Sequence, residues 1–212
     1  FNLLMRLLGG SLLAVGFAFA AEYMDDRIKT PDDIIRRLDV RFLGLIPEVA
    51  LKGRGAAPTV DGRASPSFLE AIRALRTSVM ATCPGEGMRP IVIASASENE
   101  GKTTVACNLA IALAQVRQRV LLVDADMRRP GVHGMFGGAL GPGLSNLLSE
   151  AASELDLVLR PTRVPGLQLI TAGAAPDHAP DLLGSPRFTA LLQVLLPRFD
   201  WVIFDSSVSM SE

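Results

Sequence analysis

Residues 90–115 read PIVIASASENEGKTTVACNLAIALAQ, and this stretch determines the fold that we expect for the chain. A run typical of a strand, Pro90–Ser95, leads into the loop Ala96–Thr104, and an apolar helical pattern follows. This is the context of a P-loop, whose backbone N–H groups and following helix N-terminus bind phosphate oxygens. The stretch therefore predicts a nucleoside triphosphate site in an α/β fold.

The positions of this loop have expected roles. Gly101 lets the backbone approach a phosphate, Lys102 reaches the outer phosphates, and Thr103 offers a hydroxyl group to Mg²⁺. The loop residues expected to bind the nucleotide are Ser97, Glu98, Asn99, Glu100, Gly101, Lys102, Thr103 and Thr104. The full pattern GxxxxGK[ST] asks for glycine where this chain has Ala96, so the loop needs support from other segments.

Two further apolar runs end in aspartate. VLLVDADMRRP at residues 120–130 contains Asp124 and Asp126, and FDWVIFDSS at residues 199–207 contains Asp205. Because parallel strands present their carboxyl ends at one edge of a sheet, these acids are expected beside the loop, as Mg²⁺ ligands or water-positioning groups. We expect Thr103, Asp124 and Asp205 on the metal. The alternative, ordinary strand-end caps, stays open.

Strands that alternate with helices predict a doubly wound, mostly parallel sheet of the P-loop NTPase type. The further elements that we expect are helices at residues 31–38, 67–82, 143–150 and 185–199, and strands at residues 42–49, 155–160 and 166–173. The helix at 67–82 is amphipathic, with Phe68, Ile72, Leu75 and Val79 on one face. Glu70, Arg73 and Arg76 form an adjoining stripe, which the pattern alone assigns equally to a solvated face or an interface.

Composition places limits on the partners and the compartment. The 212 residues are 49% apolar and carry a net charge of −1, which gives no general attraction to nucleic acid. Two cysteines are too few for a disulfide framework and lack metal-ligand spacing, which favours a reducing compartment.

The first residues predict a membrane attachment. Leu3–Ala21 is nearly uninterrupted apolar sequence, close to the roughly 20 residues needed to cross a bilayer, and cations after it indicate a cytoplasmic side. A signal peptide and a buried core helix are the alternatives. We therefore expect a transmembrane helix at residues 1–21, a cytoplasmic juxtamembrane segment and linker at 22–66, and a nucleotide-binding domain at 67–212. We also expect a segment of a longer protein, truncated in its C-terminal domain.

The order of these motifs resembles the bacterial tyrosine kinases fused to polysaccharide co-polymerases, over nearly the whole chain. The family's Walker A motif matches Ala96–Thr103, its DxDxR motif matches Asp124, Asp126 and Arg128, and its Walker B aspartate matches Asp205. The family's subunit-association motif ExxRxxR matches Glu70, Arg73 and Arg76.

The resemblance implies an ATP·Mg²⁺-dependent protein-tyrosine autokinase at the bacterial inner membrane, with its nucleotide domain in the cytoplasm. The implied catalytic residues are Lys102, Asp124, Asp126 and Asp205, and Arg128 joins the nucleotide-binding set. The implied partners are further copies of the chain, through Glu70, Arg73 and Arg76, and the polysaccharide polymerase and export machinery, with no nucleic acid.

This chain departs from the family after the third aspartate. Where the family continues Asp-Thr-Pro-Pro, the chain has Asp205-Ser206-Ser207-Val208. The resemblance implies that the phosphoryl acceptor is a tyrosine cluster at the C-terminus of a neighbouring subunit, whereas this sequence contains one tyrosine, Tyr23. Two alternatives therefore remain. One is a nucleotide-binding scaffold that transfers no phosphate. The other is a positioning or partition ATPase of the related deviant P-loop group, which has an extra lysine at the position that Ser97 occupies in this chain.

Overall fold

The computed structural model describes residues 2–24, 31–48, 64–85, 87, 89–149, 155–176, 178–195 and 197–207. The chain divides into two compact units, Phe1–Leu43 and Gly44–Glu212.

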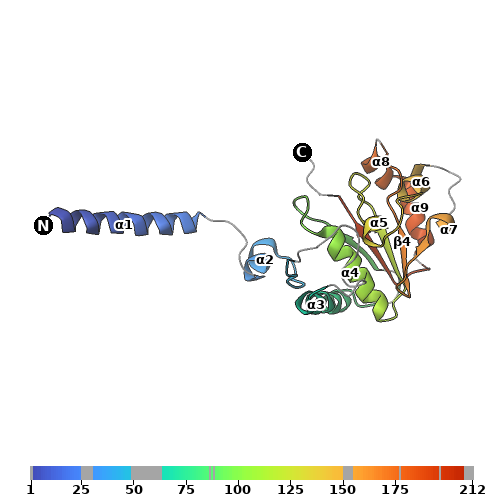
Figure 1. Ribbon diagram of the computed structural model, residues 1–212, viewed down its shortest axis with the longest axis horizontal. Helices are drawn as coiled ribbons and strands as arrows, with labels where there is room; N and C mark the ends of the chain where they lie inside the picture. The colour runs from blue at the N-terminus through green and yellow to red at the C-terminus, as the bar shows by residue number, and fades with distance from the viewer. Residues whose placement is uncertain are drawn as a thin grey trace. The chain divides into compact units, whose positions relative to one another are not determined.

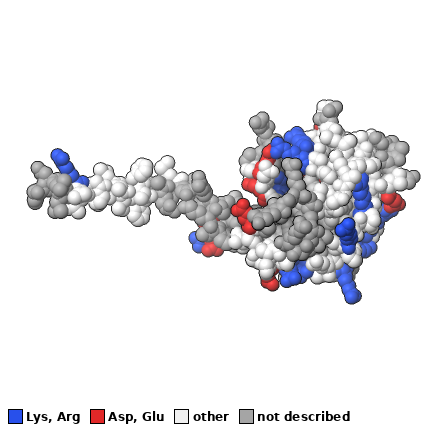
Figure 2. Space-filling view, viewed as in Figure 1, with Lys and Arg blue, Asp and Glu red and all other residues white. Residues whose placement is uncertain are grey.

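The first unit contains two helices, α1 (Asn2–Tyr23) and α2 (Pro31–Leu38). Residues 5–20 of α1 are exposed and mostly apolar, and they show as a largely white stretch in Figure 2, with blue near its start. Among the residues that the structure describes, no helix reaches the length and apolar character that crossing a membrane requires. The predicted transmembrane helix at residues 1–21 is therefore not supported. The predicted helix at Pro31 is confirmed as α2.

The second unit is built on a five-stranded sheet with the order β1-β5-β2-β4-β3. The strands are β1 (Arg89–Ile93), β2 (Val120–Asp124), β3 (Arg160–Pro161), β4 (Leu167–Ile170) and β5 (Trp201–Asp205). The first four in that order pair in parallel, and only the short β3 pairs antiparallel with β4. The predicted mostly parallel sheet is confirmed.

Helices cover both faces of this sheet (Figure 1). They are α3 (Pro66–Thr82), α4 (Lys102–Gln115), α5 (Val132–Met135), α6 (Leu144–Ser149), α7 (Leu155–Val158), α8 (Ala179–Leu183) and α9 (Pro186–Leu195). Every second residue of β2 and β5, such as Leu121, Val123 and Phe204, packs in the core against α6–α9. Because side chains alternate along a strand, the residues between them lie on the other face, where α4 packs. Helix α3 packs on α4 through Phe68 and Ile72, as its amphipathic pattern predicts.

Two predicted strands are wrong. Residues 42–48 form no strand where the structure describes them, and Ile46 instead packs against the Phe68–Ile72 cluster. The segment predicted as a strand at 155–160 begins as helix α7, with only Arg160 entering β3. Both are short apolar runs, for which periodicity does not distinguish strand from other buried structure.

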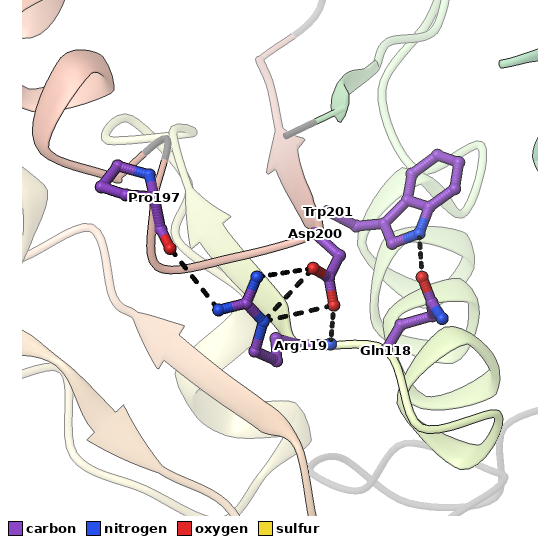
Figure 3. Close-up of polar contacts among 5 residues, drawn as sticks. All are labelled: Gln118, Arg119, Pro197, Asp200 and Trp201. Atoms are coloured by element: carbon purple, nitrogen blue, oxygen red, sulfur yellow. Dashed lines mark hydrogen bonds and ion pairs between the residues drawn. The ribbon is translucent and has the colours of Figure 1, made fainter. Parts of the chain in front are cut away.

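A polar cluster fixes the amino ends of the adjacent strands β2 and β5 (Figure 3). The Arg119 guanidinium group donates to both Asp200 carboxylate oxygens and to the Pro197 carbonyl, and the Arg119 backbone N–H donates to Asp200. The buried Trp201 donates its indole N–H to Gln118. Because these contacts join the residues just before β2 to those just before β5, they hold the strands in a register that brings Asp124 opposite Asp205.

Candidate functional site

The predicted P-loop connects β1 to α4 and has the backbone geometry of a tight anion-binding loop. Gly101 caps α4 with φ of 89°, a left-handed conformation that favours glycine. Asn99 also has a positive φ, of 60°, which asparagine tolerates better than most residues. The first turn of α4 therefore points its free N–H groups toward the space in front of the loop.

Side chains at the start of α4 connect the loop to the sheet. The Lys102 ammonium group donates to the Ser95 hydroxyl oxygen at 2.9 Å. The Thr103 hydroxyl donates to Asp205 Oδ2 at 2.6 Å, which joins α4 to the carboxyl end of β5. Lysine, threonine and aspartate thus meet at the edge that the sequence predicted.

Asp124 and Asp205 lie opposite each other on adjacent strands, and both side chains are fully buried. Asp124 Oδ2 accepts the backbone N–H groups of Gly131 and Val132, at 3.1 and 3.0 Å. The other carboxylate oxygen of each aspartate, Oδ1, has no hydrogen-bond partner among the described residues. Buried carboxylate oxygens without a partner are costly, so this pair is arranged for a ligand rather than for stability.

Burial changes the ionisation of this pair. Loss of solvent is the main reason why the pKa of Asp124 rises to about 7, and the nearby Asp205 carboxylate raises it further. Burial likewise raises the pKa of Asp205 to about 6, although the hydrogen bond from Thr103 opposes the shift. A cation beside both carboxylates would remove the cost of ionising them.

These pKa values predict how stability depends on pH. Since the folded-state pKa of Asp124 lies above its ordinary value of 3.8, its contribution to stability is complete below about pH 4 and is lost as the pH rises through about 7. Asp124→Asn should therefore gain stability relative to the wild type across this window, without Mg²⁺. Urea unfolding followed by the fluorescence of Trp201, the chain's single tryptophan, measures this difference at pH 5 and pH 8. An equal difference at both values would contradict the prediction.

A pocket of about 900 Å³ opens beside the loop. Eight of the predicted nucleotide-binding residues line it: Glu98, Asn99, Glu100, Gly101, Lys102, Thr103, Thr104 and Arg128. Asp126 lines it as well, and Asp126 Oδ1 accepts the backbone N–H of Arg129 at 3.0 Å. Ser97 is not in the lining, and its backbone N–H donates to Glu100 Oε2.

The pocket also contains residues that sequence reasoning missed. These are Ile46, Pro47, Glu48, Phe68, Val105, Arg129 and Ser207. Arg129 follows the motif residue Arg128 directly, so its position was available as a signal. The segment 46–48 carries no such signal, because its short apolar pattern predicts a strand of the sheet and not a pocket lining.

The unusual residues after Asp205 are held to the neighbouring strand. Ser206 donates both its backbone N–H and its hydroxyl to the Ile93 carbonyl, at 3.1 and 2.9 Å. Ser207 then reaches the pocket lining. Val208, the last residue of the variant sequence, lies outside the described residues.

The arrangement fits Mg²⁺ that is bound together with a nucleotide. In the described part of the chain, no group of three or more His, Cys, Asp or Glu side chains is arranged to hold a metal by itself. The available donors are the partnerless oxygens of Asp124 and Asp205 and the Thr103 hydroxyl. Mg²⁺ commonly takes one or two protein carboxylates and completes its shell with phosphates and water, so this donor set is suitable.

Comparisons with known proteins identify the family of the chain. Residues 91–149 match the model of the CobQ/CobB/MinD/ParA nucleotide binding domain. The tyrosine-protein kinase ptk of Acinetobacter johnsonii is 32% identical over 213 residues, which cover 96% of this chain and 29% of that protein. The chain thus spans less than a third of the length of this curated relative.

Solved structures show the same fold. An ATP complex of McdA from Cyanothece is 28% identical, with a TM-score of 0.51, and the match covers 59% of this chain and 50% of that one. The BceF tyrosine kinase domain is 33% identical, with a TM-score of 0.73, and the match covers 87% of this chain and 78% of that one. Since this identity extends over most of a solved kinase domain, the chain belongs to the bacterial tyrosine kinase family.

Proposed function

We propose that the unit Gly44–Glu212 binds ATP with Mg²⁺ and transfers the γ-phosphoryl group to tyrosine. The observation that carries the proposal is the meeting of Lys102, Thr103, Asp124 and Asp205 at one sheet edge, beside a pocket lined by the P-loop. The match to the BceF kinase domain supports tyrosine as the acceptor.

The residues of the chain have separate roles in this proposal. The α4 N-terminus and Lys102 bind phosphate oxygens and stabilise the charge of the transferring group. Asp124, Asp205 and Thr103 would hold Mg²⁺, which supplies further charge neutralisation when bound. Asp126 is the predicted catalytic carboxylate that lines the pocket, so we assign it to accepting the proton of the tyrosine hydroxyl.

The test is an assay of the chain with ATP·Mg²⁺ and a copolymer of glutamate and tyrosine as acceptor. The copolymer is needed because Tyr23 is the chain's single tyrosine. Phosphotyrosine in the copolymer supports the kinase. Nucleotide binding without phosphotyrosine or phosphate release would favour the scaffold, and phosphate release without phosphotyrosine would favour the positioning ATPase.

The wider setting of this activity is also proposed. As an autokinase of the polysaccharide co-polymerase type, the protein would act on exopolysaccharide or capsule polymerisation and export. Its location at the bacterial inner membrane, with the nucleotide unit in the cytoplasm, stays a prediction from the sequence.

We further propose that α3 joins copies of the chain through Glu70, Arg73 and Arg76. Arg73 pairs with Glu70 at 3.6 Å and both side chains are largely exposed, whereas Arg76 donates to the Ala112 carbonyl of α4. Arg73→Ala combined with Arg76→Ala should shift the assembly toward monomer in light scattering. Arg73→Ala alone leaves the contact with α4 and should produce part of this shift. An unchanged mass for both would make the stripe a solvated face.

A further inference from the structure

An ion pair forms part of the lining of the nucleotide pocket. Glu98 of the P-loop pairs through Oε2 with the Arg129 guanidinium group, which belongs to the loop after β2. Both residues line the pocket, and their side chains are 55% and 65% exposed. The pair is therefore accessible to an anionic ligand in the pocket.

Other donors of the loop are also occupied by acceptors of the chain itself. The Ser97 backbone N–H donates to Glu100 Oε2 at 3.1 Å, and Lys102 donates to Ser95. The three donors of these contacts are a guanidinium group, a backbone amide and an ammonium group, and their acceptors are two carboxylates and a hydroxyl. These donor types are the ones that bind phosphate in such loops. Acceptors of the chain itself therefore compete with phosphate oxygens for these donors.

We propose that Arg129 is a phosphate-binding residue for the nucleotide, and that Glu98 competes with the phosphates for its guanidinium group. The proposal rests on the proposed function, because it requires that a nucleotide binds in this pocket. Glu98 then lowers the affinity for nucleotides in proportion to their phosphate charge. The binding of ATP and ADP is weakened most, and the binding of AMP is weakened least.

Electrostatics supports an exchange of partners. An exposed ion pair contributes little net free energy, so Arg129 is released from Glu98 at low cost. A triphosphate has several negative charges and planar faces that a guanidinium group binds through two hydrogen bonds at once. The Arg129 backbone N–H donates to Asp126, so the Arg129 side chain can change partners while its backbone stays in place. After the exchange, the free Glu98 carboxylate stays near the phosphates and repels them.

The experiment is calorimetric titration of ATP·Mg²⁺, ADP and AMP into the wild type, Glu98→Gln, Arg129→Gln and the double variant. We expect Glu98→Gln to tighten ATP binding by about threefold to tenfold and AMP binding by much less. Arg129→Gln should weaken ATP binding by about tenfold. In the double variant the gain from Glu98→Gln should shrink, since no guanidinium group remains to be released.

The matched control is Asp156→Asn, which removes the carboxylate of another exposed arginine pair, with Arg198, away from the P-loop pocket. It should leave all three affinities unchanged, and a gain equal to that of Glu98→Gln would reduce the effect to net charge and overturn the proposal. If the wild type binds ATP and Glu98→Gln does not tighten it, Glu98 is no competitor. If Arg129→Gln binds ATP as the wild type does, Arg129 is no phosphate ligand. A wild type that binds no nucleotide would instead overturn the proposed function itself.

Discussion

Replacing Lys102 with methionine is expected to reduce ATP-dependent tyrosine phosphorylation by at least about 100-fold, the usual cost of removing one donor to the transition-state charge. Methionine keeps the length and helix propensity of lysine but has no charge. Among the described residues, the Lys102 side chain makes one hydrogen bond, to the Ser95 hydroxyl. Its loss should leave the fold intact, so the activity change reports on phosphate binding. The measurement is phosphotyrosine in the supplied copolymer, with circular dichroism for the fold.

A matched control is Arg163→Met, which removes an exposed cation from the loop before β4. It should retain the activity of the wild type. If Lys102→Met keeps activity within a few-fold of the wild type while folded, the lysine does not stabilise the transferring group and its assigned role is wrong.

The layout of the nucleotide-binding unit was predictable because its signals are local. The run before Ala96 and the helix after Gly101 identify a strand–loop–helix unit, and aspartates at the ends of β2 and β5 identify a shared sheet edge. The amphipathic pattern of α3 predicts its buried face correctly, at Phe68, Ile72, Leu75 and Val79. Each inference needs only hydrophobic periodicity and turn chemistry.

The rest of the site depends on contacts between distant segments, which no local pattern encodes. The sequence pattern predicts a strand around Ile46, yet Ile46 packs against the Phe68 cluster and residues 46–48 line the nucleotide pocket. The pairing of Glu98 with Arg129 joins residues 31 positions apart. Ser206 holds the loop after β5 through the Ile93 carbonyl, a contact visible only once β1 and β5 are neighbours.

Replacing Asp124 with asparagine is expected to abolish turnover while the protein stays folded. Asp124 Oδ2 accepts the Gly131 and Val132 N–H groups, and an amide oxygen accepts the same two donors. The amide NH₂ group then takes the place of Oδ1, which has no partner among the described residues. The hydrogen bonds to the loop are therefore kept, and the cost of a buried charge is removed.

The same substitution removes a carboxylate that we propose as an Mg²⁺ ligand, and a neutral amide is a much weaker ligand for a hard cation. We expect phosphotyrosine formation to fall by at least about 100-fold, the scale on which enzymes lose rate when one charge-stabilising group is removed. The protection that Mg²⁺ adds to ATP-bound protein against thermal unfolding should disappear as well. Asp156→Asn, an exposed aspartate in α7, should change neither measurement. A variant that still gains stability from Mg²⁺, or that still phosphorylates the copolymer at the wild-type rate, would show that Asp124 only anchors the Gly131–Val132 loop.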